Sequence, residues 1–485
     1  MSAICVKSVS AYLPLLRFDR AVARKELRWA GLGGNGRGHR AVAGWDEDAL
    51  TLAVEAGRVA LSQQEAQGLA PSGLTFASTS SPFIDRSVAG LATAALALPA
   101  DCFTQDVAGS RRAATSALMR ALRTDGSSAG DALILAGEKR SAMAGTAQIM
   151  SFGDGAGAVL TGPGEGVARL LGAATLNADL LDIQISAENG LPYEAENRFV
   201  RDEAVAGVYL PAIGAALAEA GISASDIAFA VVPEPVSGTY RALAKPLGLT
   251  APNFCEAITG AAGDLGAALP LFGFALALDR ATQGDRILIA GFGNGCDAMI
   301  FEVTGPGDGS ATDALGQGAV LSSYSRFLSL TGALPLNWGP RAEVNQKVSA
   351  STLFRHGRDM HGFIGGRDAG GNVQFPKTPI PVRPGAEGPE PYEDVRLADV
   401  PAVVASITAD RLNFTPDPPF YFGLVQFENG ARVPMEHCDV ADKTPEVGDK
   451  VRMRFRIKAM DRQRDQRSYF WKAAPVARPD LGGEA

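Results

Sequence analysis

The sequence lacks the features that mark several large classes of protein. No stretch of about 20 residues is both apolar and free of charge, so no membrane-spanning segment is expected. Residues 1–7 show neither the basic nor the apolar region of a secretory signal peptide. Basic residues are the minority, with 45 Lys and Arg against 53 Asp and Glu and a net charge of −8. This balance argues against nucleic acid as a partner.

Cysteine is scarce, and the five present are dispersed along the chain as Cys5, Cys102, Cys255, Cys296 and Cys438. Their number is odd and no spacing matches a set of zinc ligands. We therefore expect reduced thiols, a cytoplasmic location and no metal. Each cysteine is expected to be a small buried side chain.

Residues 3–300 alternate apolar strands with Ala-rich helices, which predicts a layered α/β fold. The expected strands are 4–9, 74–78, 132–136, 155–160, 167–175, 227–232 and 286–290. The expected helices are 47–61, 111–122, 205–220, 239–247 and 265–281. The two halves contain strand–helix units of similar length, which indicates an internal duplication.

The composition changes twice in the second part of the chain. Residues 304–316 are rich in Gly, Asp, Ser and Thr, and residues 366–391 are rich in Gly and Pro. Five short strands then follow at 402–408, 420–427, 431–436, 450–457 and 469–474, which indicates a small barrel. We expect domains at 1–165 and 166–304, a linker with a connecting helix at 305–345, and a final domain at 346–485.

The most informative segment is 106–118, DVAGSRRAATSAL, in which a strand runs into the start of a helix. A helix N-terminus presents unpaired N–H groups and a positive dipole end. Arg111 and Arg112 oppose this dipole unless an anion lies beside them. That anion is either a bound carboxylate or phosphate, or an acidic neighbour within the protein.

Two further segments carry a family resemblance. They are RAVAGWDEDALTLAVEAG at 40–57 and SFGDGAGAV at 151–159. In this order and spacing the chain resembles the thiolase superfamily, on the branch of hydroxymethylglutaryl-CoA synthase and ketoacyl synthase III. The resemblance implies a duplicated five-layer α/β/α/β/α fold and coenzyme A (CoA) thioester substrates.

The segment GGRDAGGNVQFP at 365–376 and the strands after it resemble the OB-fold accessory protein found with many thiolase-like enzymes. That protein usually begins with a four-cysteine zinc ribbon. Here no cysteine lies between Cys296 and Cys438, and His356 and His361 have no partners at ligand spacing. The resemblance therefore implies a degenerate, metal-free ribbon followed by a C-terminal OB-fold β-barrel.

The chain departs from the family at every catalytic position. The nucleophilic cysteine falls on Arg111, or on Ser110 if the frame slips by one residue. The condensing histidine falls near Glu234 and the helper asparagine on Asp264. The catalytic glutamate of the hydroxymethylglutaryl branch falls near Ser80.

Roles for the candidate site residues follow from their chemistry. Glu234 and Asp264 would handle protons, although an exposed loop acid and a helix cap explain them equally simply. Arg111 and Arg112 would hold an anionic group of the substrate. Ser110 would be a nucleophile only beside a base.

Backbone groups and surface cations complete the expected site. The turn Gly293, Asn294 and Gly295 resembles a loop that offers N–H groups to a substrate oxyanion, or is an ordinary turn. The phosphates of CoA would meet basic residues of the N-terminal segment, which otherwise form a solvated face. These are Arg24, Lys25, Arg28, Arg37 and Arg40.

The resulting hypothesis is a CoA-dependent enzyme that makes or cleaves a C–C bond beside a carbonyl without a cysteine nucleophile. Its substrate would be a β-oxo acid or a β-oxoacyl-CoA. The alternatives are a thiolase-like aldolase and a catalytically silent scaffold subunit. We also expect a homodimer, paired through an exposed edge at 132–136, and neither nucleic acid nor membrane as a partner.

Overall fold

The computed structural model describes residues 4–34, 36–63, 70–123, 130–186, 188–343, 349–386, 388–441, 444–461 and 463–481. The chain divides into two compact units. The first comprises Met1–Ala43, Asp48–Gly90 and Asp101–Leu334. The second comprises Gly44–Glu47, Leu91–Ala100 and Pro335–Ala485, so it includes two short segments from the N-terminal half.

A nine-stranded mixed sheet forms the first unit, in the order β11-β12-β13-β8-β1-β7-β6-β4-β5. Its strands are β1 Ile4–Tyr12, β4 Gly73–Ala77, β5 Phe103–Val107, β6 Ala132–Glu138, β7 Gly155–Pro163, β8 Ala168–Asn177, β11 Phe229–Val231, β12 Arg286–Phe292 and β13 Gly295–Val303. Strands β4, β6, β7 and β1 repeat as β11, β12, β13 and β8, each set with one parallel and two antiparallel pairings. The repeat confirms the duplication.

Helices and two small sheets surround these strands. The helices are α1 Arg20–Glu26, α2 Ala49–Ser62, α3 Val88–Ala95, α4 Ala113–Arg123, α5 Ala147–Ser151, α6 Asn197–Glu203, α7 Leu210–Ala220, α8 Thr239–Leu247, α9 Phe254–Ala261, α10 Leu269–Arg280, α11 Ser310–Gly316 and α12 Tyr324–Leu330. The small sheets are β2 Leu16–Asp19, β3 His39–Val42 and β14 Ala319–Leu321, and the hairpin β9 Ile183–Ile185 with β10 Pro192–Glu194.

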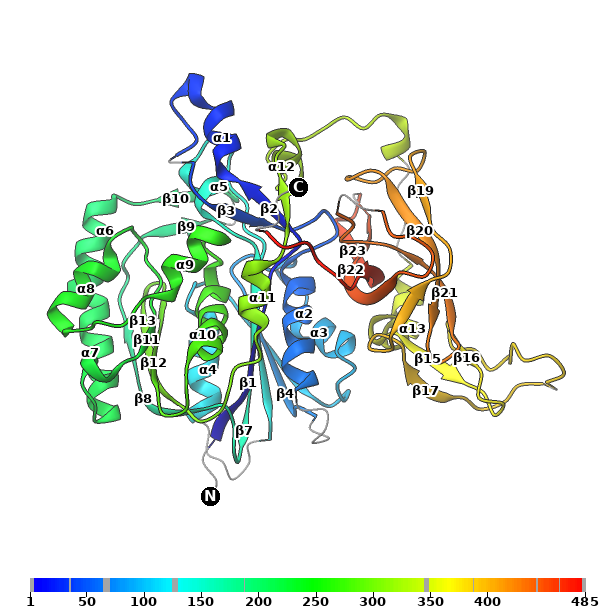
Figure 1. Cartoon of the computed structure of the whole chain (residues 1–485), viewed down its shortest axis with the longest axis horizontal. Coiled ribbons are helices and arrows are strands. Elements are labelled where there is room, and N and C mark those ends of the chain that lie inside the picture. Colours follow the sequence, from blue (N-terminus) through cyan, green and yellow to red (C-terminus); the bar gives the residue numbers. More distant parts are fainter. Residues whose placement is uncertain are drawn as a thin grey trace. The chain divides into compact units, whose positions relative to one another are not determined.

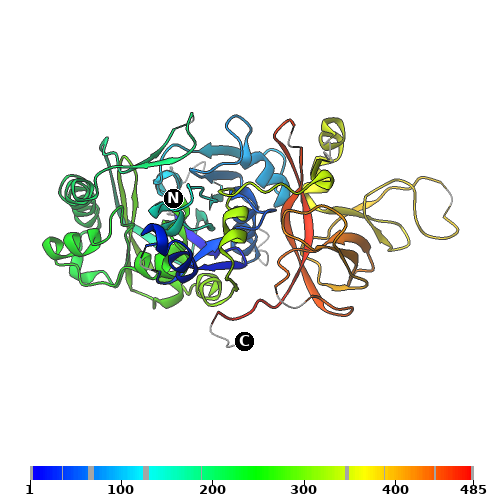
Figure 2. The same ribbon diagram turned by 90° about the horizontal axis from the view of Figure 1, so that it is seen from above.

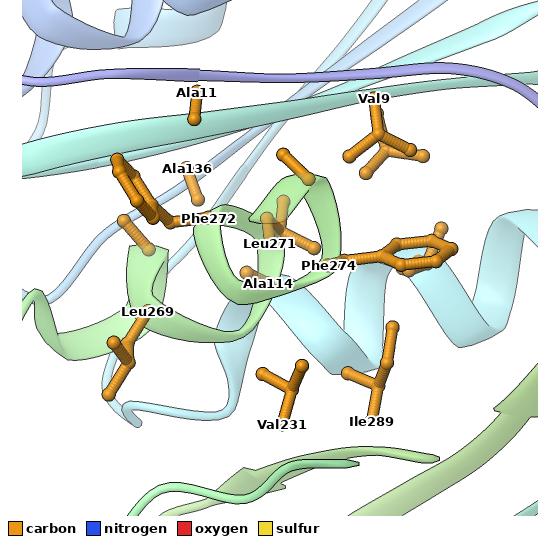
Figure 3. Packing of buried hydrophobic residues seen from close by; sticks show 14 of the residues in the cluster. Val9, Ala11, Ala114, Ala136, Val231, Leu269, Leu271, Phe272, Phe274 and Ile289 are labelled. Carbon is orange, nitrogen blue, oxygen red and sulfur yellow. The ribbon is translucent and has the colours of Figure 1, made fainter. Parts of the chain in front are cut away.

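The helices make five layers with the two half-sheets (Figure 1). Helices α4 and α10 form the middle layer, while α2 covers the outer face of the first half-sheet and α7 that of the second. Figure 3 shows Phe272 and Phe274 of α10 between Val9 of β1 on one side and Val231 and Ile289 of the second half-sheet on the other. All five side chains are buried, and their burial stabilises the stack. The expected α/β/α/β/α architecture is confirmed.

One helical run, Asn197–Ala220, is long and apolar enough to cross a membrane by length and composition alone. The run joins α6, a π-helical turn and α7. Its apolar side chains Ile213, Ala216 and Leu217 are buried in the cluster that packs α7 on the second half-sheet. The apolar character of this run is therefore explained by the packing of α7 against the second half-sheet.

The edge expected at 132–136 is wrong, because β6 lies inside the sheet between β4 and β7. Helices α2 and α4 cover the two faces of β6, which explains its uninterrupted apolar run. The edge strand on this side is β5, and its Phe103 is 67% exposed.

The second unit contains two sheets and helix α13 Ala350–Gly362. Strands β15 Ile364–Arg367, β16 Val373–Gln374 and β17 Glu393–Arg396 form the smaller sheet. The larger contains β18 Ala402–Val404, β19 Thr408–Asp410, β20 Phe420–Phe427, β21 Arg432–Glu436, β22 Lys450–Asp461 and β23 Gln466–Pro475. In Figure 2 the orange and red strands of this unit curve around one another. The OB-fold itself stays a prediction.

Buried charges hold the short segment Gly44–Glu47 within the second unit. Asp46 pairs with Lys472 at 2.9 Å, and Glu47 pairs with Arg456 at 2.9 Å. The ammonium of Lys472 also lies 4.3 Å from the ring centroid of Trp45.

Within the described part of the chain, no group of three or more His, Cys, Asp or Glu residues is arranged to hold a metal ion.

Candidate functional site

The turn between β5 and α4 places Ser110, Arg111 and Arg112 together. Helix α4 begins at Ala113, two residues later than expected, and the Ala113 N–H donates to the carbonyl of Ser110 at 3.0 Å. The Ser110 hydroxyl donates to the carbonyl of Gly293 at 2.8 Å. This bond binds the β5–α4 turn to the turn between β12 and β13. Two segments that the sequence analysis named separately thus lie side by side.

Both arginines are paired with carboxylates of the protein. Arg111 forms an ion pair with Asp182 and lies 3.9 Å from Asp264. Arg112 lies 3.3 Å from Asp297, a carboxylate that also accepts from Thr115 at 3.0 Å. The sequence left open whether a bound ligand or an acidic neighbour supplies the anion beside each arginine. The structure places an acidic neighbour beside both. Contact with a substrate anion stays a prediction.

Asp264 is the acidic centre of the cluster. Its carboxylate accepts from Arg140 at 2.7 Å and from the N–H of Gly266 at 2.9 Å. Burial opposes ionisation, but Arg140 and Arg111 outweigh it and hold the pKa of Asp264 below its usual range. The side chain still retains 24% exposure. Asp264 is therefore an ionised carboxylate with an accessible edge.

Glu138, at the end of β6, has its pKa shifted in the opposite direction to that of Asp264. Its Oε1 accepts from the N–H and hydroxyl of Thr79 at 2.7 and 2.9 Å and from the N–H of Ala267 at 3.3 Å. Its Oε2 accepts from the hydroxyl of Ser80. Burial raises the pKa of Glu138, although Arg140 and these hydrogen bonds oppose that shift. Glu138 and Asp264 bind neighbouring amides of one turn, with pKa values shifted in opposite directions.

The glycine-rich turn at 151–159 is explained by its contact with the Asp264 turn. The Gly153 N–H donates to the carbonyl of Asp264 at 2.9 Å, and the Asp264 N–H donates to the carbonyl of Ser151 at 2.8 Å. Gly263 has φ +94°, and a Cβ there would lie 2.4 Å from the carbonyl oxygen of Phe152. Only glycine permits this approach. The motif thus fixes the position of Asp264.

The turn Gly293–Gly295 is tightly packed, and one of its N–H groups is hydrogen-bonded within the turn itself. Its Gly293 N–H donates to the carbonyl of Gly295 at 3.1 Å, so this group is already used. Gly295 has φ +124°, and a Cβ there would lie 2.1 Å from the carbonyl oxygen of Leu176. Asn294, also at positive φ, donates through its side chain to Asp179 at 3.3 Å. The expected oxyanion role of this turn stays a prediction.

Glu234 lies beside the cluster rather than in it. Its carboxylate accepts from the N–H of Gly238 at 2.7 Å, at the start of α8. Burial raises its pKa against this hydrogen bond. Tyr209 connects Glu234 with the cluster electrostatically. Its hydroxyl donates to the carbonyl of Pro233 at 2.5 Å. Burial raises the pKa of Tyr209, and the charges of both Arg111 and Glu234 also act on it. The geometry accounts for Glu234 as a helix cap.

The residues of the expected cationic face differ in their burial. Arg40 is fully buried and lies 3.6 Å from Asp154, so placing it on a surface for CoA was incorrect. An interior carboxylate supplies the partner that its charge requires. Arg24, Arg28 and Arg37 are exposed, as is Lys25. Sequence reasoning missed Trp29, which belongs to the same segment of the chain and is 87% exposed.

The thiols of the chain are poorly suited to nucleophilic attack. All five cysteines lie among the described residues, and all are free of disulfides. Burial raises the pKa of each of them: Cys5, Cys102, Cys255, Cys296 and Cys438. A raised pKa keeps a thiol protonated at neutral pH, and the thiolate is the reactive form.

Comparison with solved structures decides the fold family. A structure of MvaS in complex with 3-hydroxy-3-methylglutaryl coenzyme A covers 69% of this chain and 93% of its own, with a TM-score of 0.53 and 17% identity. A Cys-to-Ser variant of Xanthomonas campestris OleA, with bound lauric acid and lauroyl-CoA, covers 62% of this chain and 99% of its own, with a TM-score of 0.54 and 18% identity. The chain has the thiolase fold.

Sequence comparison points to one branch of this superfamily. The hydroxymethylglutaryl-CoA synthase of Aeropyrum pernix is 25% identical over 351 residues, which are 71% of this chain and 94% of that protein. No family model matches the chain. The thiolase-like chain is thus similar to this hydroxymethylglutaryl-CoA synthase over nearly its whole length.

Three residues of the cluster escaped sequence reasoning: Glu138, Arg140 and Asp182. Glu138 ends an apolar strand, and the same signal had drawn attention to Glu234, so it could have been found. Asp182 lies in a segment without a strong pattern. Only the tertiary structure brings it to Arg111.

Proposed function

We propose that this thiolase-like chain is a CoA-dependent enzyme that makes or cleaves a C–C bond beside a carbonyl without a thiol nucleophile of its own. The substrates would be a CoA thioester and a β-oxo acid or β-oxoacyl-CoA. The similarity to hydroxymethylglutaryl-CoA synthase over most of that protein supports the reaction class. The observation that carries the proposal is the pair of acids Glu138 and Asp264, which accept from the neighbouring amides of Ala267 and Gly266.

CoA itself would supply the sulfur nucleophile that the chain lacks. In the cleavage direction, the CoA thiolate attacks the keto carbon of a β-oxo acid and the bond between the α and β carbons breaks. An acyl-CoA and the enolate of a shorter acid result. The enolate then takes a proton, and the reverse sequence is a Claisen condensation.

Glu138 and Ser80 would deliver this proton. Ser80 is half-buried, and its hydroxyl is held between the carboxyl of Glu138 and the N–H of Lys139, which donates to it at 2.9 Å. Burial raises the pKa of Glu138 and so favours its protonated form, which is the form that a general acid requires. In the protonated form of Glu138 the hydrogen bond to Ser80 would reverse: Glu138 would donate to the Ser80 oxygen, and Ser80 would pass its own proton to the substrate. Glu138 regains its proton from the next CoA thiol through solvent.

Asp264, Arg111 and Arg140 would set the electrostatics around the reacting carbonyl. The guanidinium groups of Arg111 and Arg140 lie beside Asp264, and these fixed positive charges would stabilise a developing enolate. For CoA, the exposed Arg24, Arg28 and Arg37 supply cations for phosphates. The exposed indole of Trp29 supplies a surface on which an adenine ring can stack.

A cytoplasmic homodimer completes the proposal. Five free, dispersed cysteines support a reducing compartment. The edge strand β5, with exposed Phe103, supports pairing of two copies across a two-fold axis.

The test is turnover by the purified chain alone, given free CoA with β-oxo acids and free CoA with β-oxoacyl-CoAs. Release or uptake of CoA is followed together with product mass. Glu138→Gln should reduce kcat by about 10²-fold or more, since a positioned acid contributes that much. The exposed Glu188 gives a matched control, because Glu188→Gln makes the same change on the surface.

A second function is favoured by the same ion pairs. Arg111 and Arg112 already have protein carboxylates beside them, as expected of a silent thiolase-like subunit that supports an active partner. Such a scaffold would show no turnover alone with any of these substrates. Turnover by the isolated chain rejects it.

A further inference from the structure

Asp182 connects the cluster to the β9–β10 hairpin. The residue directly precedes β9, and its carbonyl accepts from the N–H of Ala195, the residue after β10. Its carboxylate is 6% exposed and forms the ion pair with Arg111. The base of the hairpin is thereby tied to the residue at the family's nucleophile position.

The hairpin has little apolar packing of its own. Each strand has three residues, and none of the six is buried. Ile185 is 46% exposed and Tyr193 is 60% exposed. A two-stranded hairpin of this kind is marginally stable by itself. Polar ties therefore hold it, namely Asp182 to Arg111 and Glu194 to Gln148.

The two acidic neighbours of Arg111 differ in how firmly they are held. Asp264 is fixed by Arg140 at 2.7 Å, by the Gly266 N–H at 2.9 Å and by backbone bonds to Ser151 and Gly153. Asp182 belongs to the marginal hairpin. Of the two carboxylates, Asp182 is the one that an incoming anion can replace at lower cost.

We propose that the β9–β10 hairpin is a gate and that Asp182 occupies, in the closed state, the place on Arg111 taken by the carboxylate of a small β-oxo acid substrate. This inference rests on the proposed function and names its acid substrate. Exchange of one carboxylate for another keeps the buried guanidinium paired. The ligand can form its ion pair with Arg111 only in the open state, so its binding shifts the equilibrium between closed and open hairpin towards the open one.

Hydrogen exchange of the β9 and β10 amides tests the gate directly. Acetoacetate is the probe, and its methyl ester is the matched neutral compound. Acetoacetate should speed exchange in the hairpin of the unmodified protein, and the ester should not. Asp182→Asn should speed it about tenfold without ligand, and Glu188→Gln, in the same hairpin, should leave it unchanged. Equal effects of acid and ester, or no effect of either, would overturn the gate, and so would unchanged exchange in Asp182→Asn.

The wild-type arm with ligand needs no variant, so the test stands even if Asp182→Asn folds poorly. The outcome also separates the gate from the proposed function. Opening by acetoacetate without CoA-dependent turnover would support the gate and reject the reaction. Turnover with a hairpin that never responds to acetoacetate would support the reaction and reject the gate.

Discussion

The ion pair between Arg111 and Asp182 should dominate the electrostatic stability of the site. Arg111→Ala removes a guanidinium that is 15% exposed and leaves Asp182, 6% exposed, without its cation. Leaving a buried charge unpaired costs about 3–5 kcal/mol. Asp264 keeps Arg140, so it adds little to this cost. At about 2 °C per kcal/mol in a large domain, the melting temperature should fall by roughly 6–10 °C.

A double-mutant cycle isolates the pair from the loss of the arginine stem. Asp182→Asn alone should cost less, because Arg111 retains Asp264 at 3.9 Å. In the double variant no unpaired Asp182 charge remains, so the combined loss should be about 2 kcal/mol smaller than the sum of the single losses. Calorimetry of the four proteins gives each melting temperature.

An exposed ion pair provides the comparison for this cycle. Arg201 lies 2.9 Å from Asp202, and the two side chains are 36% and 56% exposed. Solvent screens such a pair, so Arg201→Ala should leave the melting temperature nearly unchanged. Strictly additive effects of Arg111→Ala and Asp182→Asn would refute the description of a buried, mutually dependent pair.

Three further predictions concern activity and assembly. Burial raises the pKa of Glu138, and a general acid acts only in its protonated form. The value of kcat/KM should therefore decline as pH rises through that pKa, and a pH profile of both proteins should show that this decline vanishes in Glu138→Gln. Trp29→Ala should weaken CoA binding about tenfold by calorimetric titration if adenine stacks there, and unchanged affinity would exclude that contact. Light scattering should show a dimer that Phe103→Lys shifts towards monomer, whereas a wild-type monomer at micromolar concentration would exclude pairing through β5.

The fold was predictable because its information is local and periodic. The alternation of apolar strands with Ala-rich helices gave the layers, and helix α8 has the bounds expected from sequence. Strand β13 was missed because its start, Gly295, looked like a loop. The position of β6 inside the sheet was also missed, since an apolar run fits a buried strand and an unguarded edge equally well.

The candidate site was predictable only in part, because charged side chains show no pattern that reveals their partners. Arg40 looked like a surface cation until Asp154 was seen beside it in the interior. Asp264 was found through the family resemblance, and Arg111 through its place after a strand. Their partners Arg140 and Asp182 come from separate segments, and only the folded chain brings them together.

The central claim is C–C chemistry on CoA thioesters without an acyl-enzyme thioester. Intact-protein mass spectrometry during turnover, with free CoA and a β-oxo acid present, tests it most directly. The account predicts that CoA-dependent product forms while the mass of the chain stays unchanged. An acyl adduct on a cysteine that forms and decays at the rate of turnover would contradict it.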